Sequence, residues 1–229
     1  MNKPPLEYNA FKKFIDNNRF SIKFIFFLLI KIPFDFIELI IKNFPGSLGF
    51  LLRRIYYKLR LKKMGKNVFI DIGVNFFGYN NIEIDDFCYI DKYCLITSIS
   101  KINIGKRVHL GAFSILHAGI NAPIEIGNFA GLSCNTKIYS ISESYKPNKR
   151  MSGPMIKDRE KHTISSPIKL EDECFLGPNC LILPGANIGY GSIISANTVV
   201  KRNIGELEIV NSLGKKIKKR IFNKGLFKY

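Results

Sequence analysis

The most apolar segment of this 229-residue chain, residues 22–41, contains no apolar run long enough to cross a bilayer. Its longest stretch without a charge, Phe24 to Ile30, has 7 residues, whereas a spanning helix needs about 20. The first 18 residues also lack an apolar core followed by a cleavage site. We therefore expect no signal peptide and a cytoplasmic protein.

Acidic residues are scarce, 18 Asp and Glu against 35 Lys and Arg, which gives a net charge of +17. The excess lies at the two ends, because residues 67–200 contain 12 basic and 12 acidic side chains. No helix-turn-helix, zinc-finger, RNA-recognition or KH motif accompanies this charge, so we expect no nucleic-acid partner. Anionic lipid or phosphorylated ligands are better partners for such basic ends.

Residues 1–65 are interpreted as an amphipathic helical extension. At about 100° per residue, five charges of residues 22–42 fall on one stripe of an otherwise apolar helix: Lys23, Lys31, Asp35, Glu38 and Lys42. Pro33 should divide this segment into two short helices, and Ser47 should cap a third that runs from Leu48 to about Met64 and stops at Gly65. Such an extension could lie on the cytoplasmic face of the inner membrane, or it could cap the rest of the protein or a sister subunit.

Residues 66–204 follow a period of six. Aliphatic residues recur at Ile84, Ile90, Ile96, Ile104, Leu110, Leu116, Ile126, Leu132, Ile138, Leu170, Leu176, Ile182, Ile188, Ile194 and Val200. Four positions after most of them comes a small or slim residue: Cys88, Cys94, Ser100, Val108, Ser114, Ala130, Thr136, Cys174, Cys180, Ala186, Ser192 and Thr198. This pattern predicts a chain wound into triangular coils of about eighteen residues, with parallel strands stacked about 4.8 Å apart and these residues pointing inward.

The same register explains the cysteines and reveals an insertion. Cys88, Cys94, Cys174 and Cys180 occupy the small inward position, so we expect reduced core thiols and no thiolate metal site. Between Ile126 and Leu170 the spacing rises to 44 residues, which predicts a long loop at residues 140–166. Loops of this length inside a compact fold are usually functional. Residues 205–229 form a basic C-terminal tail.

The hexapeptide pattern, and above all the run from Leu170 to Lys201, resembles the left-handed β-helix, hexapeptide-repeat acyltransferases, the sugar, maltose and xenobiotic O- and N-acetyltransferases. The resemblance implies a left-handed parallel β-helix, a homotrimer, and acetyl-CoA bound in the groove between two subunits. Two departures stand out: Phe175 replaces a frequent Trp, and the closing segment Ser212 to Arg220 lacks the family's Pro.

The resemblance also singles out candidate catalytic residues. No histidine stands where the third strand of a coil runs into the long loop, and the stretch from Ile138 to Tyr145 instead resembles a subgroup of sugar acetyltransferases. That subgroup has its histidine one coil earlier, in a segment that Val108 to Phe113 matches, which makes His109 the candidate base. His117 and His162, the other two histidines, are weaker candidates, and the alternative for each of the three is a surface imidazole with no chemical task.

The resemblance also suggests roles for other residues. Glu143 could orient the imidazole, and the acceptor pocket could be lined by Tyr139, Ser142, Tyr145 and His117. Gly177 and Ala196 could admit the pantetheine arm, while Lys201 and Arg202 could meet the nucleotide phosphates. Each of these residues could instead be ordinary packing or solvated charge.

The sequence therefore predicts an acetyl-CoA-dependent acyltransferase that acts on a hydroxyl or amine of a bacterial surface saccharide or its precursor. The alternative is a trimeric, membrane-associated scaffold without activity. A zinc enzyme of the carbonic anhydrase type needs three histidine ligands, two of them at a spacing of five, whereas His109 and His117 are eight apart, so we expect no metal.

Overall fold

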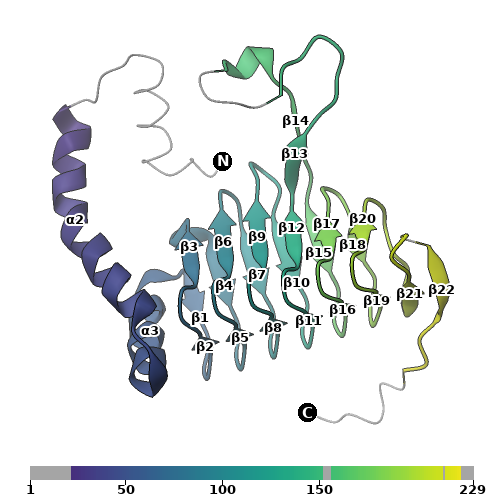
Figure 1. The fold of residues 1–229 in the computed structure, drawn as a ribbon, viewed down its shortest axis with the longest axis horizontal. Helices are drawn as coiled ribbons and strands as arrows, with labels where there is room; N and C mark the ends of the chain where they lie inside the picture. Colours follow the sequence, from purple (N-terminus) through teal and green to yellow (C-terminus); the bar gives the residue numbers. More distant parts are fainter. Residues whose placement is uncertain (1–21, 152–155, 214, 223–229) are drawn as a thin grey trace.

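In the computed structural model, residues 22–151, 156–213 and 215–222 are described. Two helices, α2 (Ile22–Asn43) and α3 (Gly46–Arg60), precede a left-handed parallel β-solenoid with three faces (Figure 1). Within these residues, neither helix combines the length and apolarity that crossing a bilayer requires.

Each coil contributes one short strand to each of three sheets, called faces A, B and C. Face A contains β1 (Lys63–Met64), β4 (Ile82–Ile84), β7 (Ile102–Ile104), β10 (Ile124–Ile126), β15 (Ile168–Leu170) and β18 (Asn187–Ile188). Face B contains β2 (Phe69–Ile70), β5 (Tyr89–Ile90), β8 (His109–Leu110), β11 (Gly131–Leu132), β16 (Phe175–Leu176), β19 (Ile193–Ile194), β21 (Glu208–Val210) and β22 (Lys216–Lys219). Face C contains β3 (Asn75–Phe77), β6 (Leu95–Ser98), β9 (Ile115–Ala118), β12 (Lys137–Tyr139), β17 (Leu181–Ile182) and β20 (Val199–Val200).

The six-residue pattern places the core as predicted. Every aliphatic and small residue of the two series above is buried, with at most 5% of its surface exposed. Strands of successive coils pair in parallel with matching residues in register, as in Ile90 beside Leu110 and Leu132 beside Leu176. The prediction of a hexapeptide solenoid is therefore confirmed.

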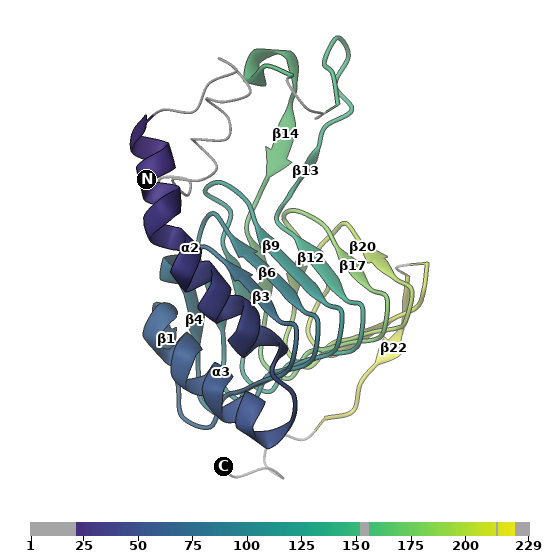
Figure 2. The same ribbon diagram turned by 60° about the vertical axis from the view of Figure 1, so that its left-hand side comes forward.

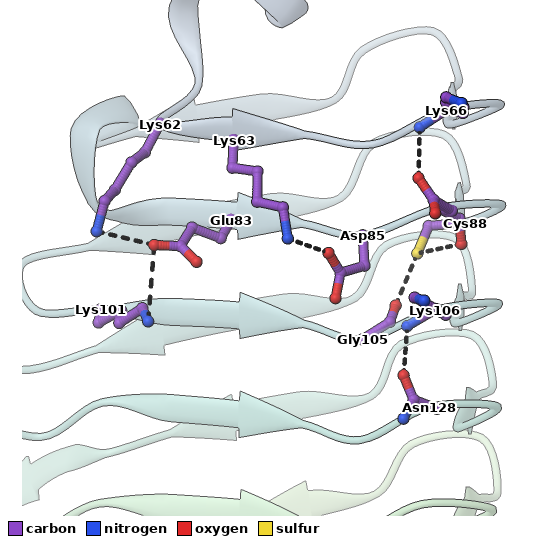
Figure 3. Close-up of polar contacts among 11 residues, drawn as sticks. Lys62, Lys63, Lys66, Glu83, Asp85, Cys88, Lys101, Gly105, Lys106 and Asn128 are labelled. Atoms are coloured by element: carbon purple, nitrogen blue, oxygen red, sulfur yellow. Dashed lines mark hydrogen bonds and ion pairs between the residues drawn. The ribbon is translucent and has the colours of Figure 1, made fainter.

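The small inward residues also satisfy carbonyl groups of the next coil. The Cys88 thiol donates to the Gly105 carbonyl oxygen at 2.9 Å (Figure 3), and Cys94 donates to Gly111 at 3.2 Å. Burial raises the pKa of the Cys88 thiol to about 11 and that of Cys94 to about 12, so both stay protonated at neutral pH. These thiols are structural donors.

The long insertion forms an arm at the corner where the chain leaves face C. Strand β13 (Ile141–Glu143) pairs antiparallel with β14 (Thr163–Ser165), and the arm projects from the solenoid in both views (Figures 1 and 2). A short 3₁₀ turn, η2 (Asp158–Glu160), lies in its outer part. Because this corner joins faces C and A, the arm stands opposite face B.

The helices differ from the sequence-based expectation in three respects. Helix α2 is continuous through Pro33, so the expected division into two helices is wrong; an interior proline removes one hydrogen bond and a helix can absorb this as a bend. Helix α3 begins at Gly46, and Ser47 does not cap it. It ends at Arg60 and not at Gly65, because Lys63 and Met64 already pair with β4 as the first coil.

Arg53 fastens the helices to the open end of the solenoid. Its side chain is 1% exposed and donates to the Ile70 carbonyl at 2.8 Å and to the Phe44 carbonyl at 2.7 Å. Ile70 belongs to β2, the first strand of face B, and Phe44 follows the end of α2. One guanidinium thus supplies donors to the solenoid edge and to the helix end.

Candidate active site

His109 lies on face B with its imidazole outside the solenoid. The Asp91 carboxylate of the preceding coil lies 3.1 Å from Nε2 of His109. The ring of Tyr89 stacks on the imidazole, with the ring centroids 5.4 Å apart and an angle of 10° between the ring planes. An ionised carboxylate only accepts hydrogen bonds, so this contact requires a proton on Nε2 and leaves the lone pair on Nδ1. The His109 side chain is 56% exposed, so an incoming acceptor can reach it.

A slot of about 260 Å³ adjoins this imidazole. Its lining consists of Asp91, His109, Gly111, Ala112, Gly131, Leu132, Ser133, Cys134 and Phe175. Gly131 is the register neighbour of both His109 and Phe175 on face B. A Cβ atom on Gly131 would come within 3.1 Å of Phe175 Cδ2, so the absent side chain leaves room between imidazole and phenyl ring.

A second cluster lies on face C and the arm. His117 and Tyr139 are register neighbours with ring centroids 5.9 Å apart. Burial lowers the pKa of His117, which favours its neutral form. Ser142 and Glu143 lie on β13, and the Tyr145 side chain just beyond is 91% exposed. His162 accepts a hydrogen bond from Ser144 through its backbone, and its Nδ1 is buried without a partner among the described residues.

One chain does not bring these two clusters together. His109 is on face B, whereas Glu143 is on the arm at the opposite corner. Within one chain the carboxylate beside the His109 imidazole is Asp91 and not Glu143. The sequence pattern did not single out Asp91. This residue follows inward Ile90 and lies two positions beyond Tyr89, the register neighbour of His109, so a comparison of outward residues in neighbouring coils could have found it.

The residues expected to bind the donor lie in the last coils. A Cβ atom on Gly177 would come within 2.6 Å of the Ala196 backbone nitrogen, so stacking of the coils alone requires this glycine. Lys201 and Arg202 are exposed and line a depression of about 400 Å³ together with Ser212 and Leu213. Two cations beside an open depression suit a phosphate group.

A larger groove, of about 600 Å³, runs along face A but contains no imidazole or thiol in its lining. Its charged side chains are partly paired, as in Lys63 with Asp85 at 2.5 Å and Lys62 with Glu83 at 2.8 Å (Figure 3). The slot on face B is therefore the better candidate for acyl-transfer chemistry, although it is smaller.

Comparison with known proteins agrees with the hexapeptide-repeat fold. A family model described as a hexapeptide repeat of succinyl-transferase matches residues 167–202. The dTDP-4-amino-4,6-dideoxy-D-glucose acyltransferase of Escherichia coli is 26% identical over 147 residues, 64% of this chain and 75% of that protein. A putative lipopolysaccharide biosynthesis O-acetyl transferase of Escherichia coli K12 is 25% identical and covers 78% of this chain and 69% of its own length.

Solved structures of acyltransferases are also similar to this chain. The N-acyltransferase AntD of Bacillus cereus, solved with dTDP and 3-hydroxybutyryl-CoA, superposes with a TM-score of 0.68 at 27% identity and covers 74% of this chain and 88% of its own. A hexapeptide-repeat acetyltransferase of Vibrio cholerae with acetyl-CoA, at 19% identity and a TM-score of 0.54, covers 81% of this chain and 84% of its own and shares the fold. Together, the hexapeptide-repeat match, the sugar acyltransferase relatives and the acyltransferase structures support the left-handed β-helix, hexapeptide-repeat acyltransferase superfamily for this chain.

Proposed function

We propose that the protein transfers an acetyl group from acetyl-CoA to a hydroxyl or amine of a bacterial cell-surface saccharide or its nucleotide- or lipid-linked precursor. The observation that carries this proposal is the oriented imidazole of His109, which opens on a slot of about 260 Å³ in a fold shared with CoA-bound acyltransferases. The sugar-modifying relatives support the choice of a saccharide acceptor.

In this mechanism His109 is the general base and Asp91 a positioning residue. Nδ1 of His109 takes the proton of the acceptor hydroxyl or amine while the acceptor oxygen or nitrogen attacks the thioester carbonyl. The carbon–sulfur bond then breaks, and the CoA thiolate leaves with the proton returned by the imidazolium. Backbone amides of the solenoid stabilise the oxyanion of the intermediate.

A homotrimer completes the site. In one chain His109 lies on face B, whereas Tyr139 lies on face C and Ser142, Glu143 and Tyr145 belong to the arm. Packing face B of one copy beside face C and the arm of the next would join the two halves around one acceptor. In that assembly Glu143 of a neighbouring copy would bind a sugar hydroxyl or support the imidazole.

The donor lies along the last coils, in the groove between two subunits of the trimer. Its pantetheine arm passes Gly177 and Ala196, and its phosphates meet Lys201 and Arg202 at the depression beside Ser212. No metal takes part in this mechanism. The enzyme works peripherally on the cytoplasmic face of the inner membrane, where lipid-linked saccharides are assembled.

The proposal is tested by incubating the full-length protein in mild detergent with acetyl-CoA and a panel of amino- and hydroxy-sugar nucleotides. Release of CoA is followed by chromatography, because the exposed thiol of Cys134 would react with thiol-detecting dyes. Calorimetry with acetyl-CoA, with desulfo-CoA as the control, measures donor binding separately. Acceptor-dependent release supports the proposal, whereas no CoA binding at millimolar concentration overturns it in favour of the scaffold alternative.

A further inference from the structure

Helix α2 turns part of its polar stripe toward the protein. The Glu38 carboxylate accepts a hydrogen bond from the Tyr56 hydroxyl at 3.0 Å and another from Tyr79, which follows the first coil. The Lys42 ammonium donates to Asn75 Oδ1 on β3 at 2.7 Å. Two charged side chains at the carboxyl end of α2 thus dock it onto the protein, whereas an ordinary surface helix packs through its apolar side.

The rest of α2 consequently presents apolar side chains outward. Those that are 47–85% exposed are Ile22, Ile25, Phe26, Leu29, Ile30, Ile32, Phe34, Phe36, Ile37, Leu39 and Ile40. Soluble monomers rarely expose a contiguous apolar surface of this extent, and such surfaces mark an interaction site.

Helix α3 continues this apolar surface. It buries Gly49, Arg53 and Tyr57 against the solenoid. On its other side stand Leu48, Leu51, Ile55 and Leu59, which are 52–82% exposed and spaced three or four residues apart. This spacing aligns them in one stripe along the outer side of the helix.

The charges beside this stripe indicate what covers it. Helix α3 contains no acidic residue, and Arg54 and Lys58 lie between its outward leucines and isoleucine. A second copy of the same surface would bring these cations together, which is unfavourable. A bilayer with anionic headgroups complements both the apolar stripe and the cations.

We infer that the outer sides of α2 and α3 form one bilayer-docking surface, with the leucines, isoleucines and phenylalanines in the acyl-chain boundary and Arg54 and Lys58 at the phosphates of anionic lipid. This inference deepens the peripheral location proposed above. It does not depend on acyl transfer, so the two can fail separately. Arg53 and Glu38 hold this surface at the amino-terminal end of the solenoid, and the C-terminal coils extend away from it (Figure 2).

The absence of tryptophan from the chain allows a direct test with the full-length protein. The variant Ile55→Trp places one reporter on the docking surface, and Ile217→Trp places a matched reporter on β22 at the far end; the two isoleucines are 53% and 59% exposed. Vesicles contain brominated phosphatidylcholine with or without phosphatidylglycerol. We expect strong quenching and a blue shift for Ile55→Trp only in the anionic vesicles, and none for Ile217→Trp. Equal quenching of the two reporters, or none, overturns the inference.

Charge substitutions distinguish a bilayer from a second copy of the chain. We expect Ile55→Glu combined with Leu59→Glu to reduce flotation with anionic vesicles at least tenfold, whereas Ile217→Glu leaves it unchanged. If Ile55→Glu instead lowers the oligomeric mass measured by sedimentation in detergent, the surface joins two copies and the inference is wrong. Calorimetry with acetyl-CoA on the same variants shows whether donor binding persists, which keeps this test separate from that of the enzymatic activity.

Discussion

The Asp91 carboxylate lies 3.1 Å from Nε2 of His109 across two successive coils of the solenoid. This contact orients the imidazole with Nδ1 as the free acceptor, while the stacked ring of Tyr89 limits its rotation. A carboxylate that holds an imidazole in one tautomer and orientation serves the same purpose in the Ser-His-Asp triad.

Replacing His109 by Ala should lower kcat by about 10²- to 10⁴-fold, the usual contribution of a general base. Acetyl-CoA binding should be nearly unchanged, because the proposed phosphate contacts lie at Lys201 and Arg202. Chromatographic rates at saturating acetyl-CoA and calorimetry on the same preparation measure the two effects. An unchanged rate would remove His109 from the mechanism.

Asp91→Asn should lower kcat while the KM for acetyl-CoA stays within about twofold of the original value. An amide can donate to Nε2 and so favours the wrong tautomer. Asp91→Glu keeps the acceptor and should recover part of the rate, which separates positioning from a structural role. A loss that Asp91→Glu does not relieve, accompanied by a lower melting temperature, would assign Asp91 to folding.

The sequence was sufficient for the interior of this fold because burial follows the six-residue period directly. The period did not predict the bulky residues at the corners of the coils. Phe87 and Tyr93 adopt φ values of 61° and 59°, which are unfavourable for large side chains. Contacts between coils compensate, as where Tyr93 stacks on Phe113 at 5.4 Å. The partnership of Asp91 and His109 depends in the same way on which outward residues two coils bring together.

The charge stripe of residues 22–42 could be read from the sequence, but not whether it faces solvent or the rest of the protein. An exposed stripe with a buried apolar side is the usual arrangement. Only the contacts of Glu38 with Tyr56 and of Lys42 with Asn75 reveal that these two members of the stripe point toward the protein.

Gly131→Val should close the slot beside His109 and raise the KM for acetyl-CoA or the acceptor. The new Cβ would lie 3.1 Å from Phe175 Cδ2, closer than ordinary van der Waals contact, so the phenyl ring would have to shift. Position 131 faces outward. Phe175 is its register neighbour in the next coil, and Ile193 is the register neighbour of Phe175 in the coil after that. The solenoid therefore accepts a branched side chain at this position of a coil. Ile193→Ala is the matched control, and unaltered kinetics for Gly131→Val would show that the slot is not used.

Arg53→Ala should destabilise the protein by about 3 kcal/mol, because it removes the donor to the buried Ile70 carbonyl and to the part-buried Phe44 carbonyl. Arg54→Ala, at the next and partly exposed position, should cost less than about 0.5 kcal/mol. Urea unfolding followed by circular dichroism gives both values. Similar costs for the two variants would contradict the role assigned to Arg53.

Cys134 should be the one thiol that reacts in the native protein at pH 8. The other four cysteines are buried, and burial raises the pKa of Cys174 to about 12 and of Cys88 to about 11, so their thiolate populations are negligible until unfolding. Mass spectrometry after brief iodoacetamide treatment should find a single adduct, absent from Cys134→Ser. Because Cys134 lines the slot with His109, acetyl-CoA should slow its alkylation, and equal rates with and without acetyl-CoA would place the donor elsewhere.

His117 should make the protein less stable in mild acid. Burial lowers its pKa in the folded state, whereas in the unfolded chain an imidazole titrates near about 6.5. Below that pH the unfolded state binds the additional proton, so the free energy of unfolding falls as pH falls and is unaffected above it. His117→Gln should therefore show a smaller loss of stability between pH 7.5 and about pH 5 than the unmodified protein. Urea midpoints at the two pH values measure this difference, with His109→Gln as the exposed control; an equal loss for His117→Gln and the unmodified protein would show that His117 does not titrate in this range.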